Sequence, residues 1–365
     1  MIPYIIPFIF LYLLSESENL NIFSKILNNK YFYFLLSLFF IIFIGLRSGI
    51  GCDWDTYISL HEKYSSQNFG DILKNNFSAI YKLDELGNIL ITKLSNNIYT
   101  LNILYSILFI IPLFFFCSKS ERKYLSLLIS YPYYIVVIGM GPIRQAACIS
   151  FLMFSIILIM RKRYYSHFLL SIFSLLIHQS SIIVNGLILI PDFRNLTKSI
   201  KNKISNRYNI LILVLILTSI AFSSPSIIYS TFYYFKFYGN IIPQAKSAVF
   251  IWLINFIPSI IFISNYSKFN FENSLKKILI LFAIFSFLLL PLIFLNSVIA
   301  YRLLLYLFPS SILITSNIPN LNLFQIKKSY LLNIIYASSF SSLIIWLNFA
   351  YHSSCWVPYR NILLK

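Results

Sequence analysis

The sequence predicts an all-helical, polytopic membrane protein. The chain is 58% hydrophobic and only 11% charged, against about 25% charged residues in an ordinary soluble domain. Apolar runs that approach the roughly 20-residue length of a membrane span recur from one end to the other. These runs are unbroken Ile, Leu and Phe, without the alternating pattern of a membrane barrel. A water-soluble protein is therefore excluded.

The predicted spans follow the apolar runs, and one run allows two interpretations. Segment 164–191 fits either one long helix or a hairpin of two short helices that meet near His178. A single crossing would put the basic loops 161–163 and 194–207 on opposite sides of the membrane, whereas a hairpin puts both on the cytoplasmic side, as the positive-inside rule asks. With the hairpin we expect about 12 spans in one domain over residues 1–365. The other runs are 2–14, 31–46, 98–117, 124–139, 144–160, 210–222, 248–264, 277–294, 301–315 and 331–350. We interpret the first as a retained span, because it has no basic n-region and no small-residue cleavage site.

Two polar segments fall on the outer side in this topology. Segment 47–97 holds six of the 11 acidic residues. Its pieces SLHEKYSSQNFGDILKNNF and DELGNILITKLSNNI are typical of short amphipathic helices that lie on the membrane surface. Segment 223–247 is rich in Tyr and Phe, which suits an aromatic lid over a sugar as well as an ordinary interfacial belt.

Several classes of partner are not favoured. The net charge of +18 comes from lysines and arginines in short loops, where retention on the cytoplasmic side explains them without a nucleic acid. The four cysteines and four histidines show no metal-ligand spacing, so we expect no metal and no cofactor. A bond between Cys52 and Cys355 would require both to lie on one oxidising face, and the sequence does not favour it.

Polar residues gather at the end of the second run, in GLRSGIGCDWDTY. Gly49 and Gly51 allow a tight turn, and Arg47 ends the apolar run. Either Asp53 or Asp55 is a candidate general base, although both also suit solvated loop carboxylates or helix caps. A further candidate in the same stretch, Tyr57, is also typical of the interfacial aromatic belt.

Two other arginines fall at the same membrane depth. Arg144 and Gln145 follow Pro142 at the start of a span, where free backbone N–H groups favour an anion. Arg302 lies in AYRLLLY. Each arginine alone could simply extend to the interface, but arginine is disfavoured on the outer side and its planar group suits phosphate. An anionic, phosphorylated ligand in the outer leaflet would explain them together.

His178 lies in the apolar stretch SLLIHQSSIIV, at the expected hairpin tip. A lone histidine in such a run is commonly a hydrogen-bonded packing residue. Its predicted position on the same face as the arginines favours the alternative, a general base or a donor to a leaving phosphate.

These pieces, taken in order, resemble the EpsG-type polysaccharide polymerases, which are Wzy-like proteins. RSGIGCDWDTY is similar to the family's RxGxGxDxxxY pattern, from Arg47 to Tyr57. Each further element is only a few residues long, but the ordered set covers nearly the whole chain. These elements are E-x-G (Glu85, Gly87), R-Q (Arg144, Gln145), H-x-S (His178, Ser180), R-x-x-x-Y (Arg302, Tyr306) and a closing P-Y (Pro358, Tyr359). Asp55 has no counterpart in the pattern.

The resemblance implies a GT-C-like, metal-independent glycosyltransferase of the bacterial inner membrane whose active site faces the periplasm. It would move a glycan carried on undecaprenyl pyrophosphate to the non-reducing end of the next lipid-linked repeat unit. Arg47, Arg144 and Arg302 would hold the pyrophosphate, and Asp53 or His178 would take the proton of the acceptor hydroxyl. The remaining candidates, Tyr57, Gln145, Tyr306 and Tyr359, would contact the glycan or the pyrophosphate. A chain-length regulator is a further expected partner.

Other functions use the same features. An O-antigen ligase handles the same donor with a different acceptor, and one sequence does not separate the two. A flippase or exporter of lipid-linked oligosaccharide would favour charges through the bilayer centre and two repeated halves, neither of which the sequence has. An acyltransferase would need a histidine or acid within reach of a donor on the inner face, which the predicted topology does not offer.

Overall fold

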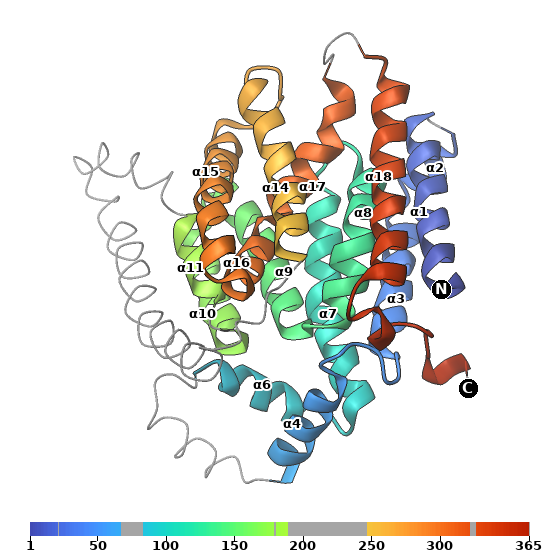
Figure 1. The fold of residues 1–365 in the computed structure, drawn as a ribbon, viewed down its shortest axis with the longest axis vertical. Coiled ribbons are helices and arrows are strands. Elements are labelled where there is room, and N and C mark those ends of the chain that lie inside the picture. The colour runs from blue at the N-terminus through green and yellow to red at the C-terminus, as the bar shows by residue number, and fades with distance from the viewer. Residues whose placement is uncertain (21, 67–82, 179, 189–246, 322–325, 365) are drawn as a thin grey trace, which may run out of the picture. The chain divides into compact units, whose positions relative to one another are not determined.

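The structure is a computed structural model of the 365-residue chain. It describes residues 1–20, 22–66, 83–178, 180–188, 247–321 and 326–364. Every regular element in these ranges is a helix (Figure 1). Apart from the helices, one isolated antiparallel β-bridge pairs Arg47 with Asn361 within the described ranges.

Six helices in the described part of the chain are long and apolar enough to cross a membrane. They are Ile98–Cys117, Ile143–Met160, Ser247–Ser264, Asn273–Leu295, Ser297–Asn320 and Lys328–Phe349. Three shorter apolar helices, Lys30–Gly45, Lys123–Ile138 and Tyr164–Ile177, coincide with other predicted spans. The chain is thus an all-helical, multi-pass membrane protein, as predicted. The expected span 210–222 and nearly all of the outer segment 223–247 lie outside the described residues, so the total number of spans and the GT-C-like arrangement stay predictions.

The chain divides into two compact units, each made of separate stretches of sequence. Unit 1 comprises Met1–Asp71, Asn88–Ser150 and Ile312–Lys365. Unit 2 comprises Ile72–Gly87 and Phe151–Ser311. Three helices, α6 (Leu83–Lys93), α9 (Ile143–Met160) and α17 (Phe308–Asn317), begin in one unit and end in the other. The expectation of a single membrane domain stays a prediction.

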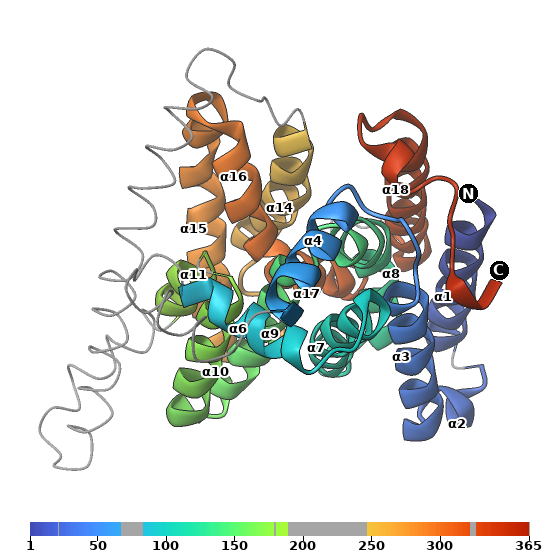
Figure 2. The same cartoon turned by 90° about the horizontal axis from the view of Figure 1, so that it is seen from below.

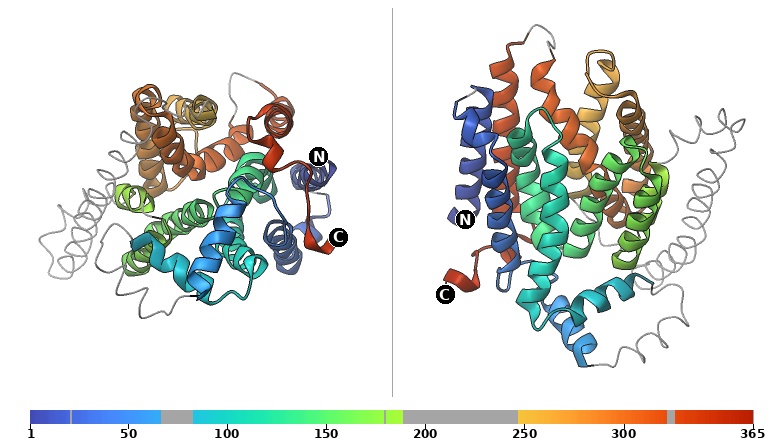
Figure 3. Two further views of the ribbon diagram at one scale, coloured as in Figure 1. Left: turned by 60° about the horizontal axis from the view of Figure 1, so that its bottom comes forward. Right: turned by 180° about the vertical axis from the view of Figure 1, so that it is seen from behind.

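Unit 1 is a bundle in which α3 packs on α7 and α1 packs on α8 (Figure 3). Polar caps begin two of these helices: the Asn29 side chain accepts from the Tyr31 amide, and Asn97 with Thr100 forms a capping box. Large aromatic side chains such as Phe40 and Tyr131 are fully buried between the helices. The helices of this unit are α1 (Ile2–Asn19), α2 (Ser24–Leu27), α3 (Lys30–Gly45), α4 (Trp54–Ser66), α7 (Ile98–Cys117), α8 (Lys123–Ser130) and α18 (Lys328–Phe349).

A π-helical stretch, η2 (Tyr131–Ile138), continues α8 and is buried throughout. Such stretches are rare and often lie at functional sites. The Tyr131 hydroxyl donates to the Tyr4 carbonyl, which ties this stretch to α1. It leads through one more helical step at Gly139 and Met140 into the bend at Gly141 and Pro142, after which α9 begins.

The loops of unit 1 alternate between two ends of the bundle. At one end Arg122 Nε donates to Asn320 Oδ1 at 3.1 Å, and Lys123 Nζ donates to the Leu27 carbonyl at 2.7 Å. These two hydrogen bonds join three loops that the sequence predicts to lie on the cytoplasmic side. At the other end the Ser48 amide donates to the Arg360 carbonyl, so the loop after α3 meets the C-terminal tail. This alternation agrees with the predicted topology of these loops.

Unit 2 is built on mutual contacts of α14 (Ser247–Ser264), α15 (Asn273–Leu295) and α16 (Ser297–Leu304) (Figure 2). A buried amide fastens these helices. Asn255 Nδ2 donates to the Leu304 carbonyl at 3.1 Å, and the Ser311 hydroxyl donates to Asn255 Oδ1 at 2.6 Å. Leu304 and Ser311 lie on either side of the 3₁₀ turn η3 (Leu305–Leu307), so these two hydrogen bonds fix the position of η3 in the unit.

The break near His178 is where the sequence predicts it. Helix α10 (Tyr164–Ile177) ends one residue before His178, whose backbone is extended, and α11 (Ser181–Leu187) begins three residues after it. The two helices contact each other across the break. The membrane side on which this turn lies stays a prediction.

The amphipathic helices expected in segment 47–97 are present where the structure describes that segment. They are α4 and α6. The stretch 67–82 between them lies outside the described residues.

Candidate active site

The first cluster is built on the glycine turn that follows α3. Gly49 and Gly51 both have positive φ, +64° and +93°, a conformation that costs other residues free energy. A Cβ on Gly51 would lie 2.1 Å from the Met140 carbonyl oxygen. Glycine is therefore required at position 51 both for its φ and because the turn lies directly on the chain before α9.

Arg47 is the largest fully buried side chain of this cluster, and its contacts are structural. Nε donates to the Ile50 carbonyl at 3.2 Å and Nη1 to the Ile44 carbonyl at 2.8 Å. The guanidinium carbon lies 5.8 Å from the centre of the Trp54 ring, within cation–π range. The third nitrogen, Nη2, has no hydrogen-bond partner among the described residues. Arg47 thus joins the end of α3 to the glycine turn.

Burial lowers the pKa of Arg47 to about 10, and nearby Tyr57 opposes this change. A pKa of about 10 still leaves Arg47 protonated at neutral pH. The cluster therefore contains a permanent buried positive charge. Such a charge attracts an anion even where the guanidinium does not touch it.

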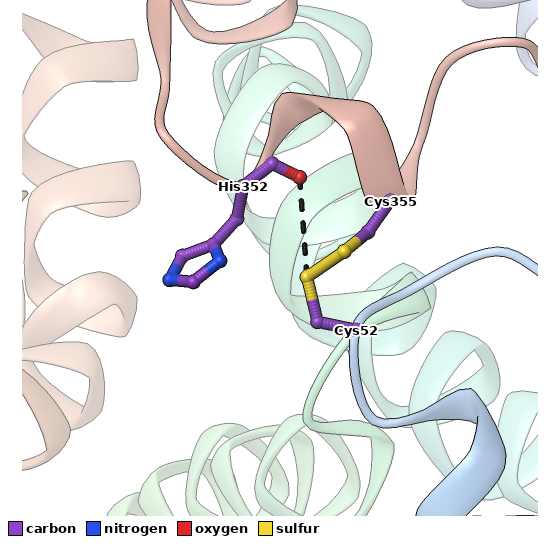
Figure 4. Close-up of a disulfide and its surroundings, with 3 residues drawn as sticks. All are labelled: Cys52, His352 and Cys355. Atoms are coloured by element: carbon purple, nitrogen blue, oxygen red, sulfur yellow. Dashed lines mark hydrogen bonds between the residues drawn. A yellow bond between two sulfur atoms is a disulfide. The ribbon is translucent and has the colours of Figure 1, made fainter.

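The C-terminal tail holds the glycine turn in place. Cys52 forms a disulfide with Cys355, and the carbonyl oxygen of His352 lies beside the bond (Figure 4). The Gly51 amide also donates to the Cys355 carbonyl. A disulfide that the sequence does not favour is therefore present, and two segments that are 303 residues apart are joined at the candidate site.

Tyr359, predicted to bind substrate, also contacts the end of α3. Its hydroxyl donates to the Phe43 carbonyl at 2.7 Å and accepts from Asn361 Nδ2 at 2.9 Å. Its ring stacks on Phe43 with 4.8 Å between centroids. These contacts anchor the tail, so a direct role of Tyr359 in substrate binding stays a prediction.

A tryptophan of the tail supports the turn before α9. Trp356 Nε1 donates to the Val136 carbonyl at 3.0 Å. A Cβ on Gly141 would meet the Trp356 ring at 3.0 Å, so the glycine is needed for this close approach. Three segments of unit 1 are thereby packed together: the glycine turn, the start of α9 and the tail.

Arg144 stands in the first turn of α9, at the end of the helix that carries the positive pole of its dipole. Its guanidinium carbon lies 6.0 Å from the centre of the Tyr57 ring. Burial raises the pKa of Tyr57, while Arg144 lowers it and Asp53 raises it further. Arg47, Asp53, Tyr57 and Arg144 therefore lie close enough to influence one another. Gln145, the next residue, is buried.

The two aspartates differ in their surroundings although both are exposed. Asp53 directly precedes α4, and its carbonyl accepts the Tyr57 amide. Its carboxylate acts electrostatically on both Arg47 and Tyr57. Asp55 lies within the first turn of α4. The geometry thus favours Asp53 as the aspartate of this cluster.

The second cluster lies in unit 2. Ser180 Oγ is 2.8 Å from His178 Nδ1 and 2.8 Å from the Tyr306 hydroxyl. Arg302 is exposed one helical turn before Tyr306, on α16. A Cβ on Gly87 would lie 2.5 Å from the Leu176 carbonyl oxygen, so this glycine lets α6 approach the end of α10 directly before His178.

The sequence predicts no metal site. No group of three or more His, Cys, Asp or Glu side chains that could hold a metal ion occurs in the described ranges. The metal independence expected from the sequence stays a prediction.

The family model that matches this sequence is described as the EpsG family, and it covers residues 30–361. The chain belongs to the EpsG family. The matched region includes the glycine turn, the start of α9, the His178 break, η3 and nearly all of the tail. No curated protein and no solved structure matches the chain. Membership indicates a membrane-embedded polysaccharide polymerase that works on lipid-linked substrates in the bilayer.

Three residues of the clusters are not singled out as site residues by the sequence. Trp54 and Trp356 both pack within the first cluster. Ser180 lies in the H-x-S element, and in the structure it links His178 to Tyr306. The positions of Cys52, inside the motif loop, and Cys355, three residues before Pro358, were the available signal for the disulfide.

Proposed function

We propose that this EpsG-family protein is an O-antigen or exopolysaccharide polymerase. It transfers a glycan from undecaprenyl pyrophosphate to the non-reducing end of another lipid-linked repeat unit. The observation that carries the proposal is the position of Arg144 in the first turn of α9, next to Tyr57 and the exposed Asp53. A helix N-terminus combined with an arginine is suited to a phosphate group.

Each residue of the first cluster has a proposed role. Arg144 binds the pyrophosphate of the donor and stabilises the charge that develops as it leaves. Arg47 holds the glycine turn and adds a buried positive charge beneath the site. Asp53, exposed and adjacent to this charge, is placed to accept the proton of the acceptor hydroxyl. Tyr57 orients Arg144 through its ring.

The other predicted residues keep their proposed roles. His178, Arg302 and Tyr306 belong to unit 2, where they are proposed to contact the transferred groups. Gln145, Asp55 and Tyr359 remain proposed contacts of the glycan or the pyrophosphate. A chain-length regulator remains a proposed partner.

The disulfide supports a periplasmic site. Disulfides persist in oxidising compartments and are rare in the cytosol, and Cys52 lies within the motif loop itself. We therefore place the first cluster at the periplasmic face of the bacterial inner membrane.

Deletion of the gene, followed by electrophoresis of surface polysaccharide, tests this function. A polymerase deletion leaves single repeat units on the lipid carrier or core, and the wild-type gene restores the ladder. Complete loss of attached repeat units would instead indicate a ligase, and accumulation of repeat units on the cytoplasmic side would indicate a flippase.

The site is tested by complementation with Arg144→Gln and Asp53→Asn. In Arg144→Gln, loss of a charged hydrogen bond costs about 1.5–3 kcal/mol, or about 10-fold to 150-fold in rate at 1.36 kcal/mol per decade. In Asp53→Asn, loss of the proton acceptor should cost about 100-fold to 10,000-fold in rate. Normal ladders from correctly inserted variants would contradict the assignment of these two residues.

A further inference from the structure

A continuous hydrogen-bonded chain links three side chains of unit 2. It runs from the Tyr306 hydroxyl through the Ser180 hydroxyl to His178 Nδ1, with 2.8 Å at each step. Ser180 and Tyr306 are 126 residues apart in the sequence. Tyr306 is fully buried and His178 is half-buried, so water competes weakly for the bonds near Tyr306.

The Ser180 side chain does not cap the helix that it precedes. Ser180 is the N-cap residue of α11, a position where serine commonly accepts from a backbone amide. Its side chain makes no capping bond. The hydroxyl is instead used to connect Tyr306 with the imidazole.

The chemistry of the three groups favours one direction of the chain. A tyrosine hydroxyl, with an ordinary pKa near 10, is a better donor than an aliphatic hydroxyl, and the unprotonated nitrogen of a neutral imidazole is a good acceptor. Hydrogen bonds also strengthen one another when each hydroxyl both accepts and donates. The favoured direction is therefore from Tyr306 to Ser180 and from Ser180 to His178 Nδ1.

We propose that Ser180 is a positioning residue that holds neutral His178 in the tautomer with its proton on Nε2. When Nδ1 accepts a hydrogen bond, the other nitrogen of a neutral imidazole must carry the hydrogen. Nε2 is then a hydrogen-bond donor and has no lone pair with which to take a proton.

This assignment separates the two candidates for the general base. Under the proposed polymerase function, on which this step rests, His178 donates a hydrogen bond to a substrate oxygen. Asp53 is then the group that accepts the proton of the acceptor hydroxyl. The tautomer itself does not depend on the identity of the substrate.

Nitrogen NMR of the full-length protein in lipid nanodiscs, labelled with ¹⁵N-histidine, reads the tautomer directly. The chain has only four histidines, and His178→Gln identifies the resonances of His178. We expect a protonated Nε2 and an Nδ1 that accepts a hydrogen bond. In Ser180→Ala the Nδ1 resonance should move downfield, toward the value of an imidazole nitrogen that accepts none.

The adjacent serine provides a matched control. Ser181 is also buried, and its hydroxyl has no hydrogen-bond partner among the described residues. Ser181→Ala should therefore leave the His178 resonances unchanged, while Ser180→Thr, which keeps the hydroxyl, should restore them. If Ser180→Ala does not fold, Tyr306→Phe tests the same chain, because it removes the first donor and should weaken the bond to Nδ1.

Two results would overturn the proposal. A wild-type His178 with its proton on Nδ1 would reverse the direction of the chain. His178 resonances that are the same in wild type, Ser180→Ala and Tyr306→Phe would show that Ser180 does not set the tautomer. Because the spectra are recorded without substrate, failure of the polymerase assignment would leave this result standing.

Discussion

Gly49 and Gly51, the two glycines of the glycine turn after α3, provide the sharpest test of how the first cluster is assembled. Both have positive φ, but their surroundings differ. A Cβ at Gly49 has no heavy atom within 4 Å, whereas a Cβ at Gly51 lies 2.1 Å from the Met140 carbonyl oxygen, far inside ordinary contact at 3.4 Å. Gly49→Ala is therefore a matched control for Gly51→Ala.

The expected costs follow from these surroundings. A non-glycine residue held at positive φ costs about 1–3 kcal/mol, which is the whole expected effect at Gly49. At Gly51 the strained φ costs about 1–3 kcal/mol and the forced separation of two backbones about 1–3 kcal/mol more. Gly51→Ala should therefore destabilise the protein by about 2–6 kcal/mol, and it should displace the start of α9 together with Arg144.

Thermal unfolding in detergent, followed with a thiol-reactive dye, measures this difference. The free cysteines of the described residues, Cys117 and Cys148, are both buried, so the dye reports their exposure. Gly51→Ala should unfold at a clearly lower temperature than Gly49→Ala and lose chain extension. Equal stability and activity of the two variants would show that the turn does not lie on the backbone before α9.

Four further predictions concern other contacts of the clusters. Cys52→Ser, Cys355→Ser and the double variant should lower activity equally, because each releases the tail from the glycine turn; additive losses would argue against one shared link, and gels run without reductant check the bond. Arg47→Lys should cost about 1–3 kcal/mol in thermal unfolding, because one ammonium cannot reproduce the fork that reaches both the Ile44 and Ile50 carbonyls. Burial lowers the pKa of Arg47 only to about 10, so Arg47 should stay protonated between pH 6 and 8. A change in activity over this pH range that is lost in Arg47→Lys would contradict this prediction. Gly87→Ala should reduce activity by pushing α6 away from the Leu176 carbonyl while the Cys52–Cys355 disulfide still forms, and unchanged activity would show that this close approach is dispensable.

The parts of the fold that depend on local pattern were predictable from the sequence. Long apolar runs gave the spans, because membrane thickness sets their length. The basic loops around 161–163 and 194–207 gave the break near His178, because charge restricts which side a loop can occupy. The start of α9 followed from Pro142, which suits the first turn of a helix.

The contacts that define the two clusters were not predictable in the same way. Nothing local in the sequence shows that Arg47 turns back to backbone carbonyls and is buried beneath Trp54. The disulfide and the link from Ser180 to Tyr306 join residues that only tertiary packing brings together. A motif pattern locates such residues, but it does not separate those that contact a ligand from those that shape the site.

Chain extension by the purified protein in liposomes is the most direct test of the central claim, that Arg144 binds the phosphate of a lipid-linked donor. The assay supplies lipid-linked repeat units and compares wild type with Arg144→Gln. Arg360→Gln is the control, because Arg360 is an exposed arginine of the tail whose described hydrogen bond uses its backbone. We predict long products from wild type and Arg360→Gln and about 10-fold to 150-fold slower extension by Arg144→Gln. Equal rates for Arg144→Gln and wild type would contradict the account.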